Sequence, residues 1–139
     1  MIVGIVGNSL KKDIAKVVLS LINILKEKEL EFYISNSLVN ICTENTLKSE
    51  KNKFLPNDKL AQASDIIVSI GGDGTMLTTA YKAHLYNKPV VGVNFGKLGF
   101  LTEVDVQDID FLVDEIINGR YTIEERMVLI GECNKKSEI

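Results

Sequence analysis

Apolar and polar positions alternate along this chain in blocks that predict helices separated by short strands. Ile2–Gly7 is a short apolar run, and from Asp13 to Lys28 the apolar residues recur every three or four positions. That spacing is typical of a helix with one buried face. Glu31–Ile34 is a second short apolar run. A strand, a helix and a second strand in this order begin a parallel α/β sheet, so we expect an α/β fold.

The same order returns in the second half of the chain, after a short predicted helix at Asn57–Ala63. Ile66–Ile70 and Pro89–Val93 are rich in β-branched residues, as are strands that are buried on both faces of a sheet. A helix is expected between them, and its apolar residues fall on one side: Leu77, Ala80, Tyr81 and Leu85. The repeated order predicts an open parallel sheet with flanking helices.

A last helix and a last strand follow. Asp105 and Asp108 mark the start of the helix and Gly119 its end. Tyr121–Cys133 is then expected to be a long strand with partial alternation. Because an apolar strand needs a partner, it either joins the edge of this sheet or begins a second domain that this chain does not contain, and we favour the second interpretation.

Residues 36–56 interrupt this order with a segment rich in Asn, Ser, Thr, Lys and Glu. A structureless loop of about 20 residues is unusual inside a compact domain. We therefore expect a short helix or strand there, followed by a mobile, lysine-rich surface segment. Its residues Lys48, Lys51 and Lys53 could contact phosphates, but a solvated loop is the favoured interpretation.

Composition narrows the class of protein. The shares of hydrophobic residues (45%) and charged residues (25%) are those of a globular domain. No apolar run approaches the roughly 20 residues that span a membrane. A net charge of -3 without a basic block argues against nucleic acid as a partner. Cys42 and Cys133 have no metal-ligand spacing, so we expect reduced thiols in a cytosolic protein.

Two glycine-bearing loops follow the apolar strands of the second half: Gly71–Thr75 (GGDGT) and Asn94–Gly99 (NFGKLG). Because the carboxyl ends of parallel strands meet at one edge of a sheet, both loops are expected at the ligand-binding edge. Their glycines would let backbone N–H groups approach a phosphate. The Walker A and Gly-x-Gly-x-x-Gly patterns are missing, which excludes two common nucleotide-binding solutions.

Asp73 is the unusual residue of the first loop, because a carboxylate repels the phosphate that such a loop would hold. It can accept or orient the proton of an attacking hydroxyl, or it can hold a divalent cation. The alternative is an ordinary turn residue. A tight turn does not require glycines on both sides of an Asp after a buried strand. Their presence therefore favours a chemical role for Asp73. Thr75 is placed to cap the helix that follows.

These residues resemble the NAD kinase family. Gly71–Leu77 (GGDGTML) is shared with diacylglycerol and sphingosine kinases and, loosely, with 6-phosphofructokinases, whereas Val91–Glu103 (VGVNFGKLGFLTE) is far more restrictive. Arg126–Leu129 (RMVL) resembles the Arg-x-x-Leu step by which that family enters its second, β-rich domain. The resemblance runs along the whole chain but reaches only about half of a typical family chain.

The resemblance implies an ATP-dependent NAD kinase, which transfers the γ-phosphate of ATP to the 2′-hydroxyl of the adenosine ribose of NAD and makes NADP. It implies that Asp73 is catalytic and accepts or orients the proton of that hydroxyl. The implied cofactor-binding residues lie on the two loops or directly after them: Gly72, Asp73, Gly74, Leu77, Asn94, Gly96, Gly99 and Phe100. A divalent cation such as Mg²⁺ is implied with ATP, and no side chain is assigned as a metal ligand.

The resemblance also implies a domain order. Residues 1–120 would form an α/β nucleotide-binding domain with a Rossmann-like sheet, and residues 121–139 would begin a truncated β-rich domain. The family's Asn-Glu or Asn-Asp pair, which holds the NAD ribose, belongs to that second domain and is not found here. A cytoplasmic enzyme that forms homo-oligomers at full length is implied. Two alternatives stay open: a non-catalytic nucleotide-binding fragment, and a lipid kinase of the diacylglycerol type, which has no reason to carry the second loop.

Overall fold

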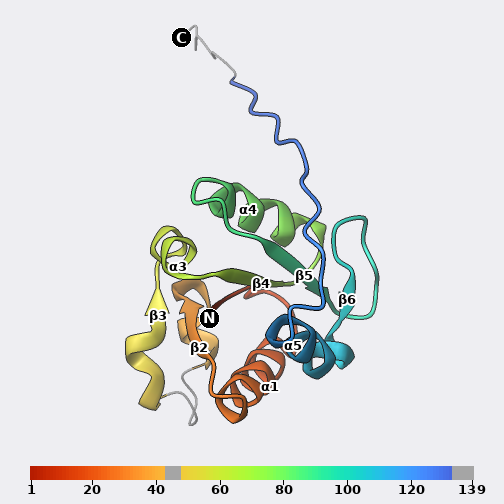
Figure 1. Ribbon diagram of the computed structural model, residues 1–139. Coiled ribbons are helices and arrows are strands. Elements are labelled where there is room, and N and C mark those ends of the chain that lie inside the picture. The colour runs from red at the N-terminus through yellow and green to blue at the C-terminus, as the bar shows by residue number, and fades with distance from the viewer. Residues whose placement is uncertain (43–47, 133–139) are drawn as a thin grey trace, which may run out of the picture.

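The computed structural model, which describes residues 1–42 and 48–132, is built around one parallel sheet. Its strands are β1 (Ile2–Gly7), β2 (Glu31–Ser35), β3 (Phe54–Leu55), β4 (Ile66–Ile70), β5 (Val90–Asn94) and β6 (Val104–Asp105). They lie in the order β3-β2-β1-β4-β5-β6 (Figure 1). The strand order reverses between β1 and β4, as in doubly wound α/β folds. The expected Rossmann-like parallel sheet is therefore confirmed.

Helices cover both faces of this sheet. They are α1 (Ile14–Glu27), α2 (Val39–Cys42), α3 (Asn57–Ala63), α4 (Asp73–His84) and α5 (Ile109–Ile117), with 3-10 turns η1 (Asn36–Leu38), η2 (Lys48–Lys53) and η3 (Val106–Asp108). In Figure 1, α1 and α5 lie below the sheet, and α3 and α4 lie above it. None of the described helices is long and apolar enough to cross a membrane.

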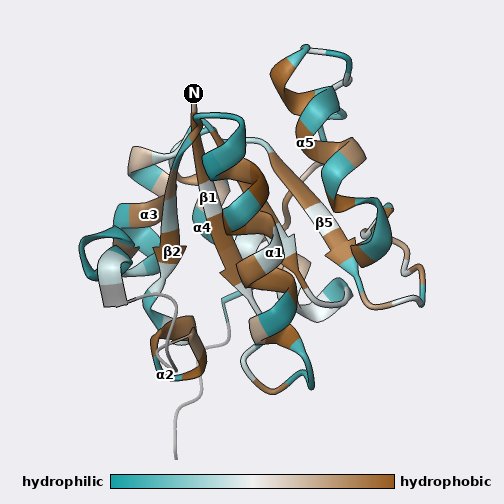
Figure 2. Ribbon diagram, turned by 90° about the horizontal axis from the view of Figure 1, so that it is seen from below, coloured by the Kyte–Doolittle hydropathy of each residue, from teal (hydrophilic) through white to brown (hydrophobic). Residues whose placement is uncertain are grey.

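The face covered by α1 and α5, here called the α1/α5 face, carries a large aliphatic core. The stripe predicted for α1 is buried: Ile14, Val18, Leu21, Ile22 and Leu25 are at most 2% exposed, and Val17 is partly buried. Figure 2 shows this helix in front of the sheet, with hydrophobic and hydrophilic bands alternating along it. Alternate strand residues, such as Ile5, Ile34 and Val68, meet it from the sheet. The prediction for this helix is confirmed.

The opposite face, here called the α3/α4 face, is packed with smaller and more polar side chains. Its buried apolar residues are Val6, Leu60, Ala61, Ile67 and Ala83. Thr79 of α4 is also buried; its Oγ1 donates to Thr75 O (2.8 Å) and lies 3.0 Å from Ser69 Oγ of β4.

The apolar side of α4 faces outward. Leu77, Tyr81 and Leu85 are 61%, 49% and 54% exposed, so the side of the helix that carries the predicted apolar residues does not face the core. The helix presents Thr79 and Ala83 to the sheet instead. These small side chains let the backbone of α4 lie close to β4, where larger ones would not fit.

Residues 36–56 begin with short helical elements, as predicted: η1 and α2. The lysine-rich segment that was expected to be mobile forms the 3-10 turn η2, and β3 follows it. Residues 43–47 lie outside the described part of the chain. Of the lysines expected at the surface, Lys53 is engaged in contacts. Its Nζ lies 2.8 Å from the Glu31 carboxylate and 5.5 Å from the centre of the Phe32 ring.

The strand expected at Tyr121–Cys133 is absent from the described residues 121–132, which form neither helix nor strand. Every one of these residues is exposed, including Met127 (88%) and Leu129 (87%). Figure 1 shows the segment leaving α5 and running past α4 away from the sheet. No described strand lies beside it to share hydrogen bonds, and an apolar sequence without such a partner does not form a strand.

Candidate functional site

The first glycine loop ends earlier than predicted, because α4 begins at Asp73 and not after Thr75. Gly72 is the N-cap residue, in extended conformation (φ -110°, ψ -168°) and without a side-chain cap. An acidic residue in the first turn suits the positive end of the helix dipole, so the helix starts directly after the two glycines. The N–H groups of Gly74 and Thr75 consequently have no partner within the helix.

Asp73 joins the two glycine loops. Its Oδ2 accepts a hydrogen bond from the N–H of Phe100 (2.9 Å), and its Oδ1 accepts one from the N–H of Leu101 (3.0 Å). The second loop passes so close that a Cβ built on Gly99 would overlap this carboxylate. The two loops that the sequence placed at one edge therefore meet at the Asp73 side chain. Each carboxylate oxygen keeps a further lone pair, so the group can still accept a proton or another hydrogen bond.

Asn94 shapes the second loop from a buried position, with 1% of its surface exposed. Its Oδ1 accepts from the N–H of Gly96 (2.9 Å), which has a φ of +84° that disfavours other residues. The Asn94 Nδ2 is buried and has no hydrogen-bond partner among the described residues. Buried amides are normally paired, so this nitrogen is an exception among the buried polar groups of the described residues.

The apolar residues of the expected site are available on the surface. Phe100 is 95% exposed and follows Gly99 directly, while its N–H binds Asp73. Leu77, 61% exposed, lies about one helical turn beyond Asp73 on α4. Both side chains therefore flank the element that carries the carboxylate, and neither is part of the core.

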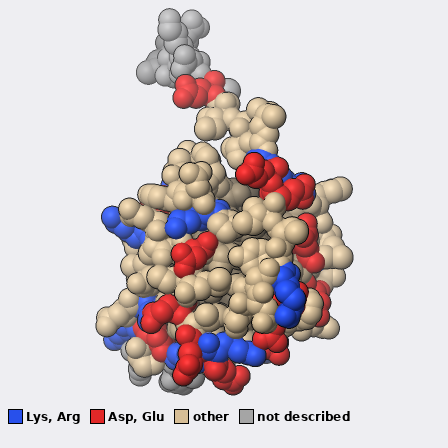
Figure 3. Space-filling model, in the orientation of Figure 1, with Lys and Arg blue, Asp and Glu red and all other residues tan. Residues whose placement is uncertain are grey.

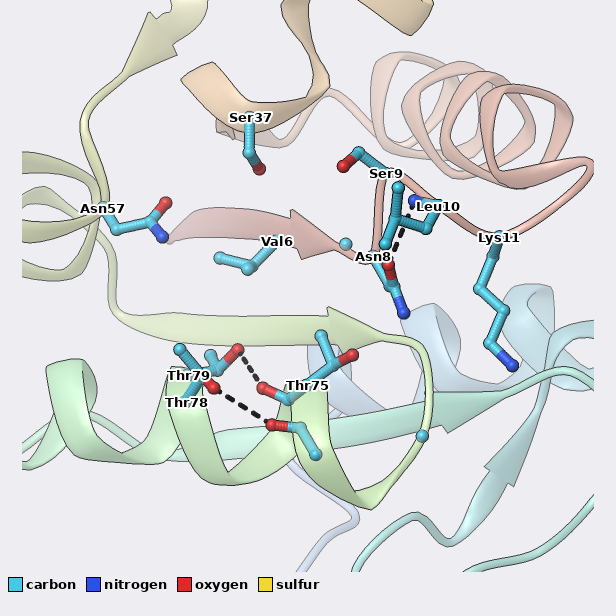
Figure 4. A pocket seen from close by; sticks show the side chains of 13 residues that line it. Val6, Asn8, Ser9, Leu10, Lys11, Ser37, Asn57, Thr75, Thr78 and Thr79 are labelled. Carbon is cyan, nitrogen blue, oxygen red and sulfur yellow. Dashed lines mark hydrogen bonds between the residues drawn. The ribbon is translucent and has the colours of Figure 1, made fainter.

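A pocket of about 530 Å³ lies at the carboxyl end of β1 (Figure 4), within the usual size range of ligand clefts. Its lining comes from the loop after β1, the turn after β2, and the starts of α3 and α4: Val6, Gly7, Asn8, Ser9, Leu10, Lys11, Ser37, Asn57, Gly72, Gly74, Thr75, Thr78 and Thr79. Neither Asp73 nor the second glycine loop belongs to this described lining. The start of α4 thus has two neighbours. Gly72 and Gly74 line the pocket, whereas the Asp73 side chain contacts the second glycine loop.

The loop after β1 was missed as a site element, although its position was a signal. β1 and β4 are the strands between which the sheet order reverses, and ligands bind at that point in open α/β sheets. The loop is held by Asn8, whose N–H donates to Ile70 O (3.0 Å) and whose Oδ1 accepts from the N–H of Leu10 (3.0 Å). Among the described residues that line the pocket, Lys11 is the only charged one, which gives the pocket a positive end.

The described residues contain no group of three or more His, Cys, Asp or Glu side chains that could hold a metal ion. On the face shown in Figure 3, basic and acidic residues are interspersed. Cys42 is free and buried, and burial raises the pKa of its thiol. It therefore stays protonated in the core, while Cys133 lies outside the described residues.

Comparison with known proteins finds relatives that are similar in sequence and a solved structure that is similar in fold. The family model of the ATP-NAD kinase N-terminal domain matches residues 3–121. An NAD kinase of Natranaerobius thermophilus is 29% identical over 127 residues, which are 91% of this chain and 42% of that protein. An NAD kinase of Heliobacterium modesticaldum is 57% identical over 72 residues, which are 52% of this chain and 25% of that protein.

Among solved structures, yeast NADH kinase complexed with NADH has a similar fold. The TM-score is 0.71 at 21% identity, over 86% of this chain and 38% of that chain. This likeness supports the α/β architecture. The chain thus spans less than half the length of these relatives.

Proposed function

This chain belongs to the ATP-NAD kinase family, and on that premise we propose that it supplies the phosphoryl-transfer half of an NAD kinase. The reaction would move the γ-phosphate of ATP to the 2′-hydroxyl of the adenosine ribose of NAD and yield NADP and ADP. The single observation that carries the proposal is the position of Asp73. It stands at the start of α4, with a pocket on one side and the second glycine loop on the other.

The second-loop side of Asp73 is the proposed acceptor side. Leu77 and Phe100 offer exposed apolar surface for the adenine of NAD. Gly99 lets the backbone reach the Asp73 carboxylate, and the turn that Asn94 makes with Gly96 holds the loop in shape. These contacts would bring the ribose hydroxyl of NAD to the free lone pairs of Asp73.

The pocket is the proposed donor side. Lys11 and the unpaired N–H groups of Gly74 and Thr75 supply positive charge and hydrogen-bond donors for the phosphates of ATP. Gly72, like Gly74, has open space where a side chain would stand, so the backbone can approach the nucleotide. The 2′-oxygen of NAD and the ADP leaving group would then lie on opposite sides of the γ-phosphorus, as in-line transfer requires.

The chemistry proposed for Asp73 is that of a general base. The 2′-oxygen attacks the γ-phosphorus while its proton passes to the Asp73 carboxylate. The bond from the γ-phosphorus to the β–γ bridging oxygen breaks, and ADP leaves with the electron pair. Since the described residues form no metal site, a divalent cation such as Mg²⁺ would arrive on the phosphates of ATP and neutralise their charge.

The proposal extends to the setting of the whole enzyme. Residues 1–120 would be its nucleotide-binding domain, and residues 121–139 would lead into the β-rich domain that completes the NAD site. The exposed apolar side chains of residues 121–130 would be buried in that domain. We further propose a cytoplasmic enzyme that forms homo-oligomers when the second domain is present.

A chimera tests the proposal. Residues 1–132 would be fused to the remaining C-terminal part of the Heliobacterium NAD kinase and incubated with ATP, Mg²⁺ and NAD, with NADP measured through an NADP-dependent dehydrogenase. We expect NADP formation, and we expect Asp73→Asn to lower turnover by about 10²–10⁴, the usual contribution of a general base.

The matched control is Asp65→Asn. Asp65 also accepts a backbone N–H, from Ile2 (2.7 Å), but it precedes β4 at the amino edge of the sheet. It should leave turnover unchanged. Wild-type turnover in the Asp73→Asn chimera would remove this residue from the chemistry. Phosphorylation of diacylglycerol in place of NAD would favour the lipid kinase alternative.

A further inference from the structure

The segment that carries the two N–H groups bound to Asp73 also rests on β5. The N–H of Glu103 donates to Gly92 O (3.3 Å). A Cβ built on Gly92 would lie 2.8 Å from Thr102 Cγ2 and 3.0 Å from Thr102 Cα. Because the second of these atoms belongs to the backbone, a side chain in place of Gly92 would push the whole segment away from the strand. Residues 99–103 can therefore lie directly on the backbone of β5 because Gly92 has no side chain.

Thr102 is the buried point of this segment. Residues 96–100 are all exposed, whereas Thr102 is 2% exposed. Its Oγ1 accepts a hydrogen bond from the N–H of Gly99 (3.2 Å). This bond closes a turn whose two inner residues are Phe100 and Leu101, and the N–H groups of these two residues donate to Asp73. The Thr102 hydroxyl thus holds the short stretch of backbone that binds the carboxylate.

The side chains inside the turn contribute little to holding it in place. Phe100 is 95% exposed, and Gly99 has no side chain. An exposed turn with few buried contacts opens easily unless hydrogen bonds fix it. The directions of the Phe100 and Leu101 N–H groups follow from the backbone angles of the turn, so they depend on the bond between Gly99 and Thr102.

We propose that Thr102 is a positioning residue for Asp73. By holding the turn at residues 99–102, its hydroxyl directs the N–H groups of Phe100 and Leu101 at the two carboxylate oxygens. The remaining lone pairs of Asp73 then point in fixed directions, as a general base needs in order to meet the proton that it accepts. This inference rests on the proposed general-base role of Asp73, and it adds the residue that sets the orientation of the base.

The alternative is that Thr102 only packs against Gly92, and two variants separate these roles. Thr102→Val keeps the methyl group that meets Gly92 and removes the hydroxyl, whereas Thr102→Ser keeps the hydroxyl and removes the methyl group. Because Gly99 is exposed, water can bind its N–H in Thr102→Val, so the fold should be retained. A positioning role makes Thr102→Val the harmful change, and a packing role makes Thr102→Ser the harmful one.

NMR tests the geometry in the whole chain. In Thr102→Val the N–H signals of Phe100 and Leu101 should shift, and their hydrogen exchange should become faster, because the turn that directs them at Asp73 is no longer closed. In Thr102→Ser both signals and both exchange rates should stay close to those of the unchanged chain.

Turnover is tested in the chimera with the C-terminal part of the Heliobacterium NAD kinase. Thr102→Val should lower kcat by about five- to tenfold, which corresponds to the worth of one hydrogen bond, and should change the KM of ATP by less than about twofold. Thr102→Ser should keep kcat within about twofold. The matched control is Ser64→Ala, which removes a buried hydroxyl just before β4, at the amino edge of the sheet, and should leave kcat unchanged.

A double variant shows whether Thr102 acts through Asp73. Once the carboxylate is replaced, its orientation no longer matters, so adding Thr102→Val to Asp73→Asn should change kcat by less than about twofold. A residue that supports the fold independently of Asp73 would instead add its full loss.

The outcomes separate this inference from the general base itself. Unchanged N–H signals in Thr102→Val, an equal loss of kcat in Thr102→Ser, or a full additional loss in the Asp73→Asn background would each overturn the positioning role and leave the general base in place. Wild-type turnover in the Asp73→Asn chimera would remove the general base and the positioning role together.

Discussion

The two faces of the sheet are built from different side chains, although the same strands form both. On the α1/α5 face, the inward strand residues are large and aliphatic, for example Ile5, Val68 and Val93. Their immediate neighbours in the chain point to the α3/α4 face, because successive residues of a strand alternate. Three of those neighbours are glycine or serine (Gly4, Ser69 and Gly92) and one is Asn94, whereas Val6 and Ile67 form the apolar part of that face.

The difference indicates a division of labour between the faces. The aliphatic face supplies most of the apolar burial that stabilises the domain. The other face lets α3 and α4 lie close to the sheet, and it holds the pocket and the polar groups of the proposed site. This predicts that equal substitutions on the two faces have unequal effects.

The largest expected effect on stability is Leu21→Ala on α1, where the side chain is fully buried. Removing it should lower the free energy of unfolding by about 2–5 kcal/mol, through lost transfer energy and the cavity left behind. The matched substitution is Leu85→Ala at the C-cap of α4, a residue that is 54% exposed. It should change stability by less than about 0.5 kcal/mol. Urea denaturation measures both, and equal losses would contradict the division.

A smaller effect is expected from Thr79→Val on the α3/α4 face. The substitution keeps the shape of the side chain and removes the hydroxyl that bonds Thr75 O and Ser69 Oγ. Because Ser69 then keeps a buried hydroxyl without this partner, we expect a loss of about 1–3 kcal/mol.

Double-mutant analysis separates the hydrogen bond from the packing at this site. Adding Ser69→Ala to Thr79→Val removes the stranded hydroxyl and should recover part of the loss. Strictly additive losses in urea denaturation would show that the hydroxyls do not hold α4 on the sheet as a pair.

Gly99→Ala should cost about 1–2 kcal/mol, since the new methyl group would overlap the Asp73 carboxylate and part the two glycine loops. The backbone N–H signals of Phe100 and Leu101 should shift in an NMR spectrum as their hydrogen bonds to Asp73 are lost. Gly74→Ala is the control. Its methyl group meets open space within α4, so it should stabilise the domain by up to about 1 kcal/mol. Unchanged amide signals in Gly99→Ala would contradict the close contact.

The sequence predicted the elements of the fold well because each has a local signature. The stripe of α1 and the buried strands follow from periodicity, and the start of α5 follows from its acidic residues; Asp105 accepts from the N–H of Gln107 at η3. The last expected strand, 121–133, failed for a physical reason. A strand depends on a neighbour that can lie far away in sequence, so alternation alone does not create one.

The site was predicted less completely than the fold. The GGDGT and NFGKLG loops stand out in the sequence because each carries glycines directly after an apolar strand. The pocket has no such signature in the sequence, because Lys11, Ser37 and Asn57 come from three separate segments that only the sheet order brings together. One signal was readable and was not used. Gly4 of β1, Ser69 of β4, and Gly92 and Asn94 of β5 are small or polar residues in apolar strands, and they lie on the face that holds the pocket.

The smallest expected effects concern charge, since each face carries an ion pair between neighbouring helices. Lys28, at the end of α1, lies 2.8 Å from Asp114 of α5, and Lys82 of α4 lies 3.0 Å from Asp58 of α3. The partner carboxylate raises the pKa of each lysine above its ordinary 10.5. Each pair therefore adds stability at neutral pH, and this contribution is lost as the pH rises through the raised pKa.

Lys28→Met and Lys82→Met should accordingly lower the urea midpoint slightly at pH 8. Between pH 9 and 11 the urea midpoint of each variant should fall less than that of the unchanged protein. Lys59→Met is the control, because Lys59 makes no ion pair with any described residue. The two pairs are exposed to similar degrees, so solvent screens both and their effects should be equal. A much larger loss of stability for Lys82→Met would mean that ion pairing compensates for the smaller apolar core of the α3/α4 face. Equal losses would mean that the two faces differ in side-chain packing and not in charge.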